Sequence, residues 1–239
     1  MQVTPHVYVL SGNGMAGNYI RCASFSRFMK NLLIFDYDGV LVDSFDIFMS
    51  EFIHACDSED LNHIAGREQF LALFEGNMYE RMLEMGLQEE QIRRIVYTMR
   101  DGLRRQQKNL RLFKGIREAL HELSENHPLM IVTSNETRTV EDFLRAHRIH
   151  FFDEIIGSDR EPSKVKKIAY IQEAYTGYEY FYIGDTAGDI REGRRAGVKT
   201  VAVTWGWHTE QRLRRASPDY LVHNPEELVH LFRSRHPRE

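Results

Sequence analysis

Residues 31–40, NLLIFDYDGV, decide the fold prediction, because an uninterrupted apolar run ends abruptly in an acidic residue. An apolar run of this length is typical of a parallel strand that is buried on both faces. Asp36 and Asp38 follow directly, and two carboxylates one residue apart point to the same side of an extended chain. Gly39 allows a sharp turn close to a ligand. Taken alone, the string also fits an ordinary turn or part of a calcium loop, although the further ligands of an EF-hand are missing.

The same signature, an apolar run that ends in polar residues, recurs farther along the chain. Further strands are expected at residues 129–132, 152–156, 180–183, 200–203 and 220–222. Apolar residues at helical spacing predict helices at residues 115–126, 137–147, 164–175 and 189–196. Strands that alternate with helices indicate an α/β fold with an open, Rossmann-like parallel sheet. Ligands of such sheets bind beyond the carboxyl ends of the strands, where the polar residues of this chain are found.

Residues 44–111 break the alternation of strands and helices. Apolar residues recur there at helical intervals, for example Phe48 with Phe52 and Ile92 with Val96. We therefore predict an all-helical insertion over residues 44–111, which divides an α/β core made of residues 29–43 and 112–239. The aromatic and methionine side chains of the insertion are interpreted as its core rather than as a ligand site.

Residues 1–28 are kept apart from the predicted fold. They contain no Asp or Glu, and their apolar run at residues 7–10 is too short for a signal peptide. The lack of acidic residues also fits a transit peptide. The favoured interpretation is a flexible or non-native N-terminal extension, with Met29 as an alternative start, because the regular pattern begins directly after it.

Composition limits the partners and the compartment. The chain has 239 residues, 42% hydrophobic content and a net charge of −4, so no global basic field indicates nucleic acid. No apolar run approaches the roughly 20 residues that a transmembrane helix needs. Cys22 and Cys56 offer neither a zinc site nor a disulfide framework, which favours a cytoplasmic protein. A monomer and a homodimer both remain open.

The polar residues after the strand at 180–183 indicate a cation. Asp185 and Asp189 lie four residues apart in the sequence GDTAGD. Together with Asp36 they form an all-oxygen set, which suits Mg²⁺ better than zinc. Buried carboxylates in such numbers need a cation to stay charged. Asp189 also fits the N-cap of a following helix.

An anion site and a lysine complete the pattern. Thr133 and Ser134 end one predicted strand and precede a helix, where hydroxyl and backbone N–H groups can bind an anion. For either residue taken alone, ordinary helix capping is the more common explanation. Of the lysines that follow, Lys164 is the preferred candidate to reach the carboxylates and a phosphate, and Lys167 stays open.

In chain order these motifs are an apolar strand with DxDGV, a Thr or Ser at a strand end, a lysine and GDxxxD. In this order they resemble the haloacid dehalogenase superfamily of aspartyl phosphohydrolases, from about residue 30 onward. The resemblance implies that Asp36 is the nucleophile that becomes an aspartyl-phosphate. It implies that Asp38 is the general acid and base, with its backbone carbonyl on Mg²⁺.

The remaining site residues are also assigned by this resemblance. Thr133, with Ser134 beside it, corresponds to the group that binds the transferring phosphoryl. Asp185 corresponds to the metal carboxylate, and Asp189 to the outer acid that holds a metal water or the lysine. Lys164 corresponds to the lysine that neutralises nucleophile and phosphate, although the Lys-Pro that usually marks this lysine is absent.

The resemblance also suggests a substrate class. The insertion at 44–111 corresponds to a C1-type cap, in which Asn77, Tyr79, Glu80 and Arg81 are candidate selective residues. Residues 196–207 and 218–220 resemble the phosphoglycolate phosphatase branch, which implies a phosphatase, a phosphoric monoester hydrolase, for a small phosphorylated metabolite such as phosphoglycolate or a sugar phosphate.

Two other functions fit the same residues. A β-phosphoglucomutase-like phosphotransferase shares every residue assigned here and remains an alternative. A regulatory or binding protein with little turnover is a second one, although all catalytic positions are present. Asp38 argues against dehalogenase chemistry, and a cap with Lys108 as its only lysine argues against phosphonate cleavage.

Overall fold

The computed structural model describes residues 30–233, so the interpretation of residues 1–28 lies outside the described part. Six parallel strands form one sheet in the order β5-β4-β1-β6-β7-β8. Their bounds are β1 (Lys30–Phe35), β4 (Leu129–Val132), β5 (Glu154–Ile156), β6 (Tyr178–Gly184), β7 (Lys199–Val203) and β8 (Tyr220–Val222). The predicted α/β fold class with a Rossmann-like parallel sheet is confirmed.

Helices cover both faces of the sheet, which explains the uninterrupted apolar runs within its central strands. Their bounds are α5 (Ile116–Ser124), α6 (Thr137–Ala146), α7 (Lys164–Ala174), α8 (Ala187–Arg195), α9 (Glu210–Arg215) and α10 (Pro225–Arg233). Leu32 and Ile34 of β1 pack in one apolar cluster with α7, whereas Leu33 and Phe35 pack in another with α5, α6 and α10. All four side chains are fully buried. The alternation places successive side chains of β1 on opposite faces, as the pleat of a strand requires.

The register of the sheet brings the ends of the central strands together. Phe35 at the end of β1 pairs with Ile131 of β4 and with Ile183 of β6. The residues just beyond these positions therefore meet at one edge, and they include Asp36 and Asp185. This edge is the carboxyl end of the parallel sheet, where α/β folds bind their ligands.

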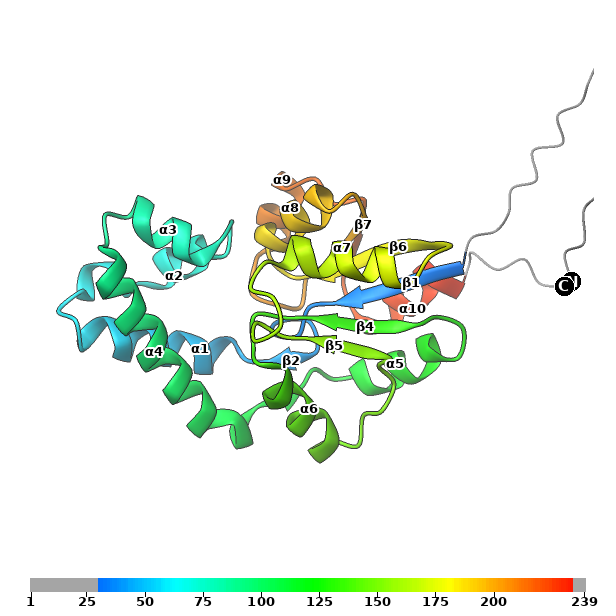
Figure 1. Cartoon of the computed structure of the whole chain (residues 1–239), viewed down its shortest axis with the longest axis horizontal. Helices are drawn as coiled ribbons and strands as arrows, with labels where there is room; N and C mark the ends of the chain where they lie inside the picture. Colours follow the sequence, from blue (N-terminus) through cyan, green and yellow to red (C-terminus); the bar gives the residue numbers. More distant parts are fainter. Residues whose placement is uncertain (1–29, 234–239) are drawn as a thin grey trace, which may run out of the picture.

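Four further α-helices lie between two short antiparallel strands, β2 (Val42–Asp43) and β3 (Arg111–Leu112). They are α1 (Phe45–Asp57), α2 (Arg67–Leu73), α3 (Met78–Glu84) and α4 (Glu89–Gln106), with single 3₁₀ turns at Asn62–Ile64 and Gln107–Asn109. We call α1–α4 the inserted helices. They have an apolar cluster of their own, and they lie on the side to which the arrowheads of β1 and β4 point (Figure 1).

The order of elements fits the insertion predicted at 44–111, and the division of the chain into a core and a cap stays a prediction. Within residues 30–233, no helix combines the length and the apolar character that crossing a bilayer requires.

Candidate active site

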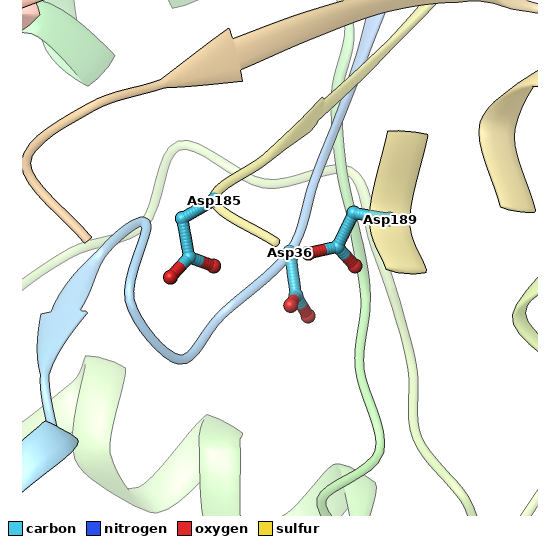
Figure 2. Close-up of side chains that lie close together, drawn as sticks. All are labelled: Asp36, Asp185 and Asp189. Carbon is cyan, nitrogen blue, oxygen red and sulfur yellow. The ribbon is translucent and has the colours of Figure 1, made fainter. Parts of the chain in front are cut away.

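Three carboxylates converge at the carboxyl end of the sheet. Asp36 follows β1, Asp185 follows β6, and Asp189 lies in the first turn of α8. One oxygen of each lies within 4.8 Å of the others, and all three residues are buried. Figure 2 shows the three side chains gathered at the ends of these elements. The predicted metal residues Asp36, Asp185 and Asp189 are thus neighbours in space.

The backbone around these carboxylates is tightly packed, and glycine makes this possible. Gly39 has φ +73°, and a Cβ atom there would lie 2.0 Å from Oδ2 of Asp185. A Cβ atom on Gly206 would lie 2.3 Å from Cβ of Asp185. Any side chain at either position would displace this carboxylate. The glycine of the DxDG string therefore provides close approach as well as a turn.

Lys164 lies between two of the carboxylates. Its Nζ is 2.9 Å from Oδ2 of Asp36 and 2.7 Å from Oδ1 of Asp189. Burial alone would lower the pKa of this lysine, but the charges of Asp189 and Asp36 outweigh burial and hold it well above its usual value. Lys164 is therefore charged and fully engaged by the carboxylates.

Asp36 and Asp185 are acids that burial makes hard to ionise. Burial raises the pKa of Asp36 to about 7, against the opposing charge of Lys164. Burial, together with the charge of Asp189, raises the pKa of Asp185 well above its usual value. Oδ2 of Asp185 accepts a hydrogen bond of 2.7 Å from the N–H of Trp207, while Oδ1 is buried with no partner among residues 30–233. An unpartnered buried oxygen between like charges fits a cation ligand, and the all-oxygen set fits Mg²⁺.

Asp189 is held by its neighbours. Its Oδ2 accepts hydrogen bonds from the N–H (3.0 Å) and the hydroxyl (2.6 Å) of Thr186, and its Oδ1 accepts from Tyr182 at 3.0 Å. Burial raises the pKa of Asp189, but Lys164 and the Thr186 hydrogen bonds outweigh burial, so the net pKa is lowered. The N-cap of α8 is Thr186, and Asp189 is the third helical residue of its capping box. The alternative that Asp189 is the N-cap is therefore wrong.

Asp38 lies outside the group of three carboxylates that could share an ion. Its Oδ2 accepts a hydrogen bond from the side-chain amide of Asn135. Burial raises the pKa of Asp38 to about 6. A carboxyl group with this pKa can hold a proton and give it up close to neutral pH, as a general acid and base must.

In the structure, Thr133 and Ser134 have different environments, and so do Lys164 and Lys167. Thr133 is fully buried, and its hydroxyl accepts a hydrogen bond of 3.1 Å from the N–H of Asn135. Ser134 is exposed and lines the cavity above the carboxylates, whereas Thr133 is absent from its described lining. Nζ of Lys167 lies 2.6 Å from the carbonyl oxygen of Thr133. Burial and the charge of Lys164 lower the pKa of Lys167 to about 8.

Of the four candidate selective residues, two line the cavity and two do not. Asn77 and Tyr79 line the cavity, and Oδ1 of Asn77 caps α3 by accepting from the N–H groups of Tyr79 and Glu80. Arg81 forms an ion pair of 2.5 Å with Glu84. Among the described residues, Glu80 and Arg81 do not contribute to the cavity wall.

Comparison with known proteins agrees with this architecture. The sequence profile described as haloacid dehalogenase-like hydrolase matches residues 33–203 of the chain. This match covers more than half of the sequence. The protein belongs to the haloacid dehalogenase-like hydrolases.

Named relatives of this hydrolase are phosphatases. It is 28% identical over 203 residues to a phosphoglycolate phosphatase of Synechococcus elongatus, covering 82% of this chain and 94% of that one. It is 26% identical over 212 residues to the pyrophosphatase PpaX of Bacillus mycoides, covering 83% and 95% of the two chains. A haloacid dehalogenase-like hydrolase of Streptococcus pneumoniae superposes with a TM-score of 0.73 at 28% identity, over 86% of this chain and 99% of that one.

Hydrogen bonds also join the inserted segment of this hydrolase to the loop after β7 and to α8, and the sequence did not indicate them. Nε2 of His208 lies 2.9 Å from the carbonyl oxygen of Leu71, and its Nδ1 accepts a hydrogen bond of 3.0 Å from the N–H of Ala187. The N–H of Gly188 donates to the carbonyl of Phe74 at 2.9 Å. Neither the loop after β7 nor the end of α2 carries a motif that indicates such a contact.

Asn135 and Trp207 are the other residues that sequence reasoning missed. Asn135 directly follows the Thr133-Ser134 strand end, so its position was the available signal for a contact with Asp38. Trp207 donates its backbone N–H to Asp185, and its ring lies among four phenylalanines of the inserted segment. They are Phe45, Phe48, Phe70 and Phe74, with ring centroids 4.7 to 6.0 Å away.

Proposed function

We propose that this protein is a Mg²⁺-dependent phosphatase that hydrolyses a small phosphorylated metabolite through an aspartyl-phosphate at Asp36. One observation carries the proposal: the buried carboxylates of Asp36, Asp185 and Asp189 lie together, and the ammonium group of Lys164 pairs with only two of them, Asp36 and Asp189. Three carboxylates need more positive charge than one lysine provides. A divalent cation would supply the missing positive charge and would attract the phosphoryl group of a substrate.

In this proposal, Asp36, Asp185 and the backbone carbonyl of Asp38 hold Mg²⁺, and Asp189 holds a metal water or Lys164. The bound ion supplies charge neutralisation at the oxygens of the transferring phosphoryl group. Lys164 adds a fixed positive charge beside the nucleophile. Charge that is placed in advance is the main contribution of protein groups to phosphoryl transfer.

The chemical steps are assigned to Asp36 and Asp38. A carboxylate oxygen of Asp36 attacks phosphorus, and Asp38 donates a proton to the departing oxygen of the leaving group. Asp38, now ionised, then removes a proton from the water that attacks the aspartyl-phosphate, which releases phosphate and restores Asp36. The amide of Asn135 supports this role because it holds one oxygen of Asp38 in place.

We assign phosphate binding to Ser134 and Thr133. Ser134 is exposed and lines the cavity, and buried Thr133 supports the loop through its hydrogen bond with Asn135. We also propose that residues 44–111 form a cap that covers the site and selects the substrate. The cap would exclude bulk water during attack at Asp36.

Phosphoglycolate and sugar phosphates are the proposed substrates, and the first is favoured by the relative from Synechococcus elongatus. A cytoplasmic location is proposed from the sparse cysteines, of which Cys56 is free and buried. No membrane partner is proposed, and no nucleic acid is proposed because the net charge is −4.

A substrate panel tests this function. Purified protein would be given phosphoglycolate, sugar phosphates, nucleotides and p-nitrophenyl phosphate, with Mg²⁺ or with EDTA. We expect phosphate release from at least one metabolite, and little release in EDTA. Isomerised sugar phosphate without net phosphate release would instead identify a phosphotransferase. Absence of release from every compound, or release that EDTA leaves unchanged, would contradict the proposal.

A further inference from the structure

The cavity above the carboxylates has two unlike surfaces. It has a volume of about 430 Å³, within the range of roughly 300–1,000 Å³ that is usual for small-molecule sites. Its floor contains Asp36, Asp38, Asp185 and Lys164. Its wall from the inserted helices and their loops is mainly apolar, with Phe48, Phe74, Met78, Val96, Met99 and Leu103. The leaving group of a substrate would therefore contact mainly apolar side chains.

Arg100 of α4 interrupts this apolar wall. Among the described residues, it is the one basic side chain that the inserted helices contribute to the cavity. The side chain is exposed and has no ion pair or hydrogen bond with any residue between 30 and 233. Lys164, the basic residue of the floor, is already shared by Asp36 and Asp189. Arg100 is therefore the cation available to a ligand.

The other arginines of α4 show that this state is particular to Arg100. Each of them forms an ion pair with an acidic side chain: Arg93 with Glu89 and Glu90, Arg94 with Glu59, Arg104 with Glu136, and Arg105 with Asp101. Among the arginines of α4, only Arg100 has no acidic partner between residues 30 and 233, and it is the one that lines the large cavity.

Hydroxyl groups lie on the same part of the wall. Ser134 and Ser158 line the cavity together with Arg100. All three also belong to the lining of a smaller recess of about 60 Å³, which includes the ion pair of Arg104 with Glu136. Neither serine side chain has a hydrogen-bond partner among residues 30–233. Because Ser134 is assigned to the transferring phosphate, the hydroxyl of Ser158 is the one left for a second anion. A guanidinium group beside a free hydroxyl suits a carboxylate or a phosphate, which accept several hydrogen bonds at once.

We propose that Arg100 is a specificity-determining residue that binds a second anionic group, a carboxylate or a second phosphate, on the leaving group of the substrate. This inference rests on the proposed phosphatase function and narrows its substrate class. Arg100 acts on the part of the substrate that does not react. It should therefore affect binding of the second anion and leave the transfer step at Asp36 unchanged.

The test compares substrates that differ in the second anion alone. Phosphoglycolate carries a carboxylate as its second group. In 2-hydroxyethyl phosphate, called the neutral substrate below, an uncharged hydroxyl takes the place of that carboxylate. Ethylene glycol bisphosphate carries a second phosphate, so the two anionic substrates distinguish the two sources of charge. Each would be measured with wild type, Arg100→Gln, Arg100→Lys and the control Arg93→Gln, which removes a paired arginine of the same helix.

In wild type, at least one anionic substrate should have a higher kcat/KM than the neutral one. Arg100→Gln should lower kcat/KM for that substrate by roughly tenfold to a hundredfold, mainly through KM, because a charge-assisted hydrogen bond is lost. For 2-hydroxyethyl phosphate, the change should stay below about threefold. Arg100→Lys should retain part of the preference, because it keeps the charge and loses the planar fork. Arg93→Gln should match wild type.

Two results would overturn the inference while the phosphatase function stands. One is a wild type that hydrolyses the neutral substrate as well as both anionic ones. The other is an Arg100→Gln variant whose kcat/KM falls equally for charged and neutral substrates, or does not fall. Failure of wild type to hydrolyse any compound with Mg²⁺ would overturn the proposed function and this inference together.

Discussion

The ammonium group of Lys164 lies 2.9 Å from Oδ2 of Asp36, at the carboxyl end of the central strand β1. Both residues are buried, so water screens this ion pair weakly. Lys164 also binds Asp189, which fixes the ammonium group from a second side. The nucleophile proposed here thus has a permanent positive charge beside it before any substrate arrives.

Replacing each of the two buried lysines distinguishes their roles. Lys164→Met should lower kcat by about a hundredfold or more, because it removes charge stabilisation beside the reacting group. Lys167→Met removes one hydrogen bond to the carbonyl of Thr133, so it should cost about 1–3 kcal/mol of stability and retain most of the activity. Steady-state kinetics and urea unfolding would measure both. Greater loss of activity in Lys167→Met would reverse the assignment.

Asp185→Asn should stabilise the metal-free protein, and more so as the pH rises. A folded-state pKa raised above the ordinary value means that the folded protein holds a proton that the unfolded chain has lost. Stability is therefore lost as the pH rises above the ordinary pKa of 3.8. The variant lacks this penalty, so in EDTA its Tm should exceed that of wild type at about pH 8, with a smaller difference at about pH 5.

Added Mg²⁺ should reverse the order of the two Tm values, so that wild type becomes more stable than Asp185→Asn. Wild type should gain stability, about 2.7 kcal/mol at a hundred times Kd, whereas Asp185→Asn should gain much less. In wild type, Asp189 contributes in the opposite direction, because its pKa is lowered. A Tm for Asp185→Asn below that of wild type in EDTA at the higher pH would contradict the account.

Asp38→Asn should separate the two half-reactions. The general acid matters most for a poor leaving group, so turnover of an alkyl phosphate should fall by roughly 10²–10⁴-fold. p-Nitrophenolate leaves readily without a proton, but the second step still lacks its base. Rapid mixing with p-nitrophenyl phosphate should therefore show a burst of nitrophenolate followed by slow turnover. A hydrolytic step as fast as that of wild type would mean that Asp38 is not the base.

Trp207→Ala should loosen the contact between the inserted segment and α8. The ring of Trp207 packs on phenylalanines of the inserted segment, so its loss should cost about 3–5 kcal/mol and raise KM. The amide of Gly188, which donates to Phe74, should exchange with deuterium faster. Trp207→Phe is the control and should retain most of the protection. Unchanged exchange at Gly188 in Trp207→Ala would show that the ring does not hold this contact.

The sequence predicted the sheet and the polar strand ends because both depend on local patterns. Parallel strands buried on two faces are apolar throughout, and residues directly after them must meet at one edge. Asp36 and Asp185 could be predicted as neighbours for this reason, before any distance was known.

The choice between Lys164 and Lys167 could not be made from sequence. The two residues lie three apart in α7 and so share a side of the helix. The position of α7 along the sheet decides that one reaches Asp36 and the other the carbonyl of Thr133. That offset is a tertiary property, which helical spacing does not encode.

In the inserted helices, the sequence likewise does not show which arginine, Arg100 or Arg81, is available to a ligand. Arg81 lies in the segment expected to select the substrate, yet it pairs with Glu84. Arg100 has no distinctive sequence context, yet it lines the cavity. Which arginine is free depends on how α3 and α4 pack against the rest of the chain.

The central claim, that Asp36 is the nucleophile, is tested most directly by Mg²⁺-dependent phosphate release from p-nitrophenyl phosphate by Asp36→Asn and wild type, side by side. An amide cannot form the aspartyl-phosphate, and it keeps the size of the side chain. We predict no detectable turnover by Asp36→Asn, with a fold that matches wild type by circular dichroism. Release by Asp36→Asn at the wild-type rate would contradict the account.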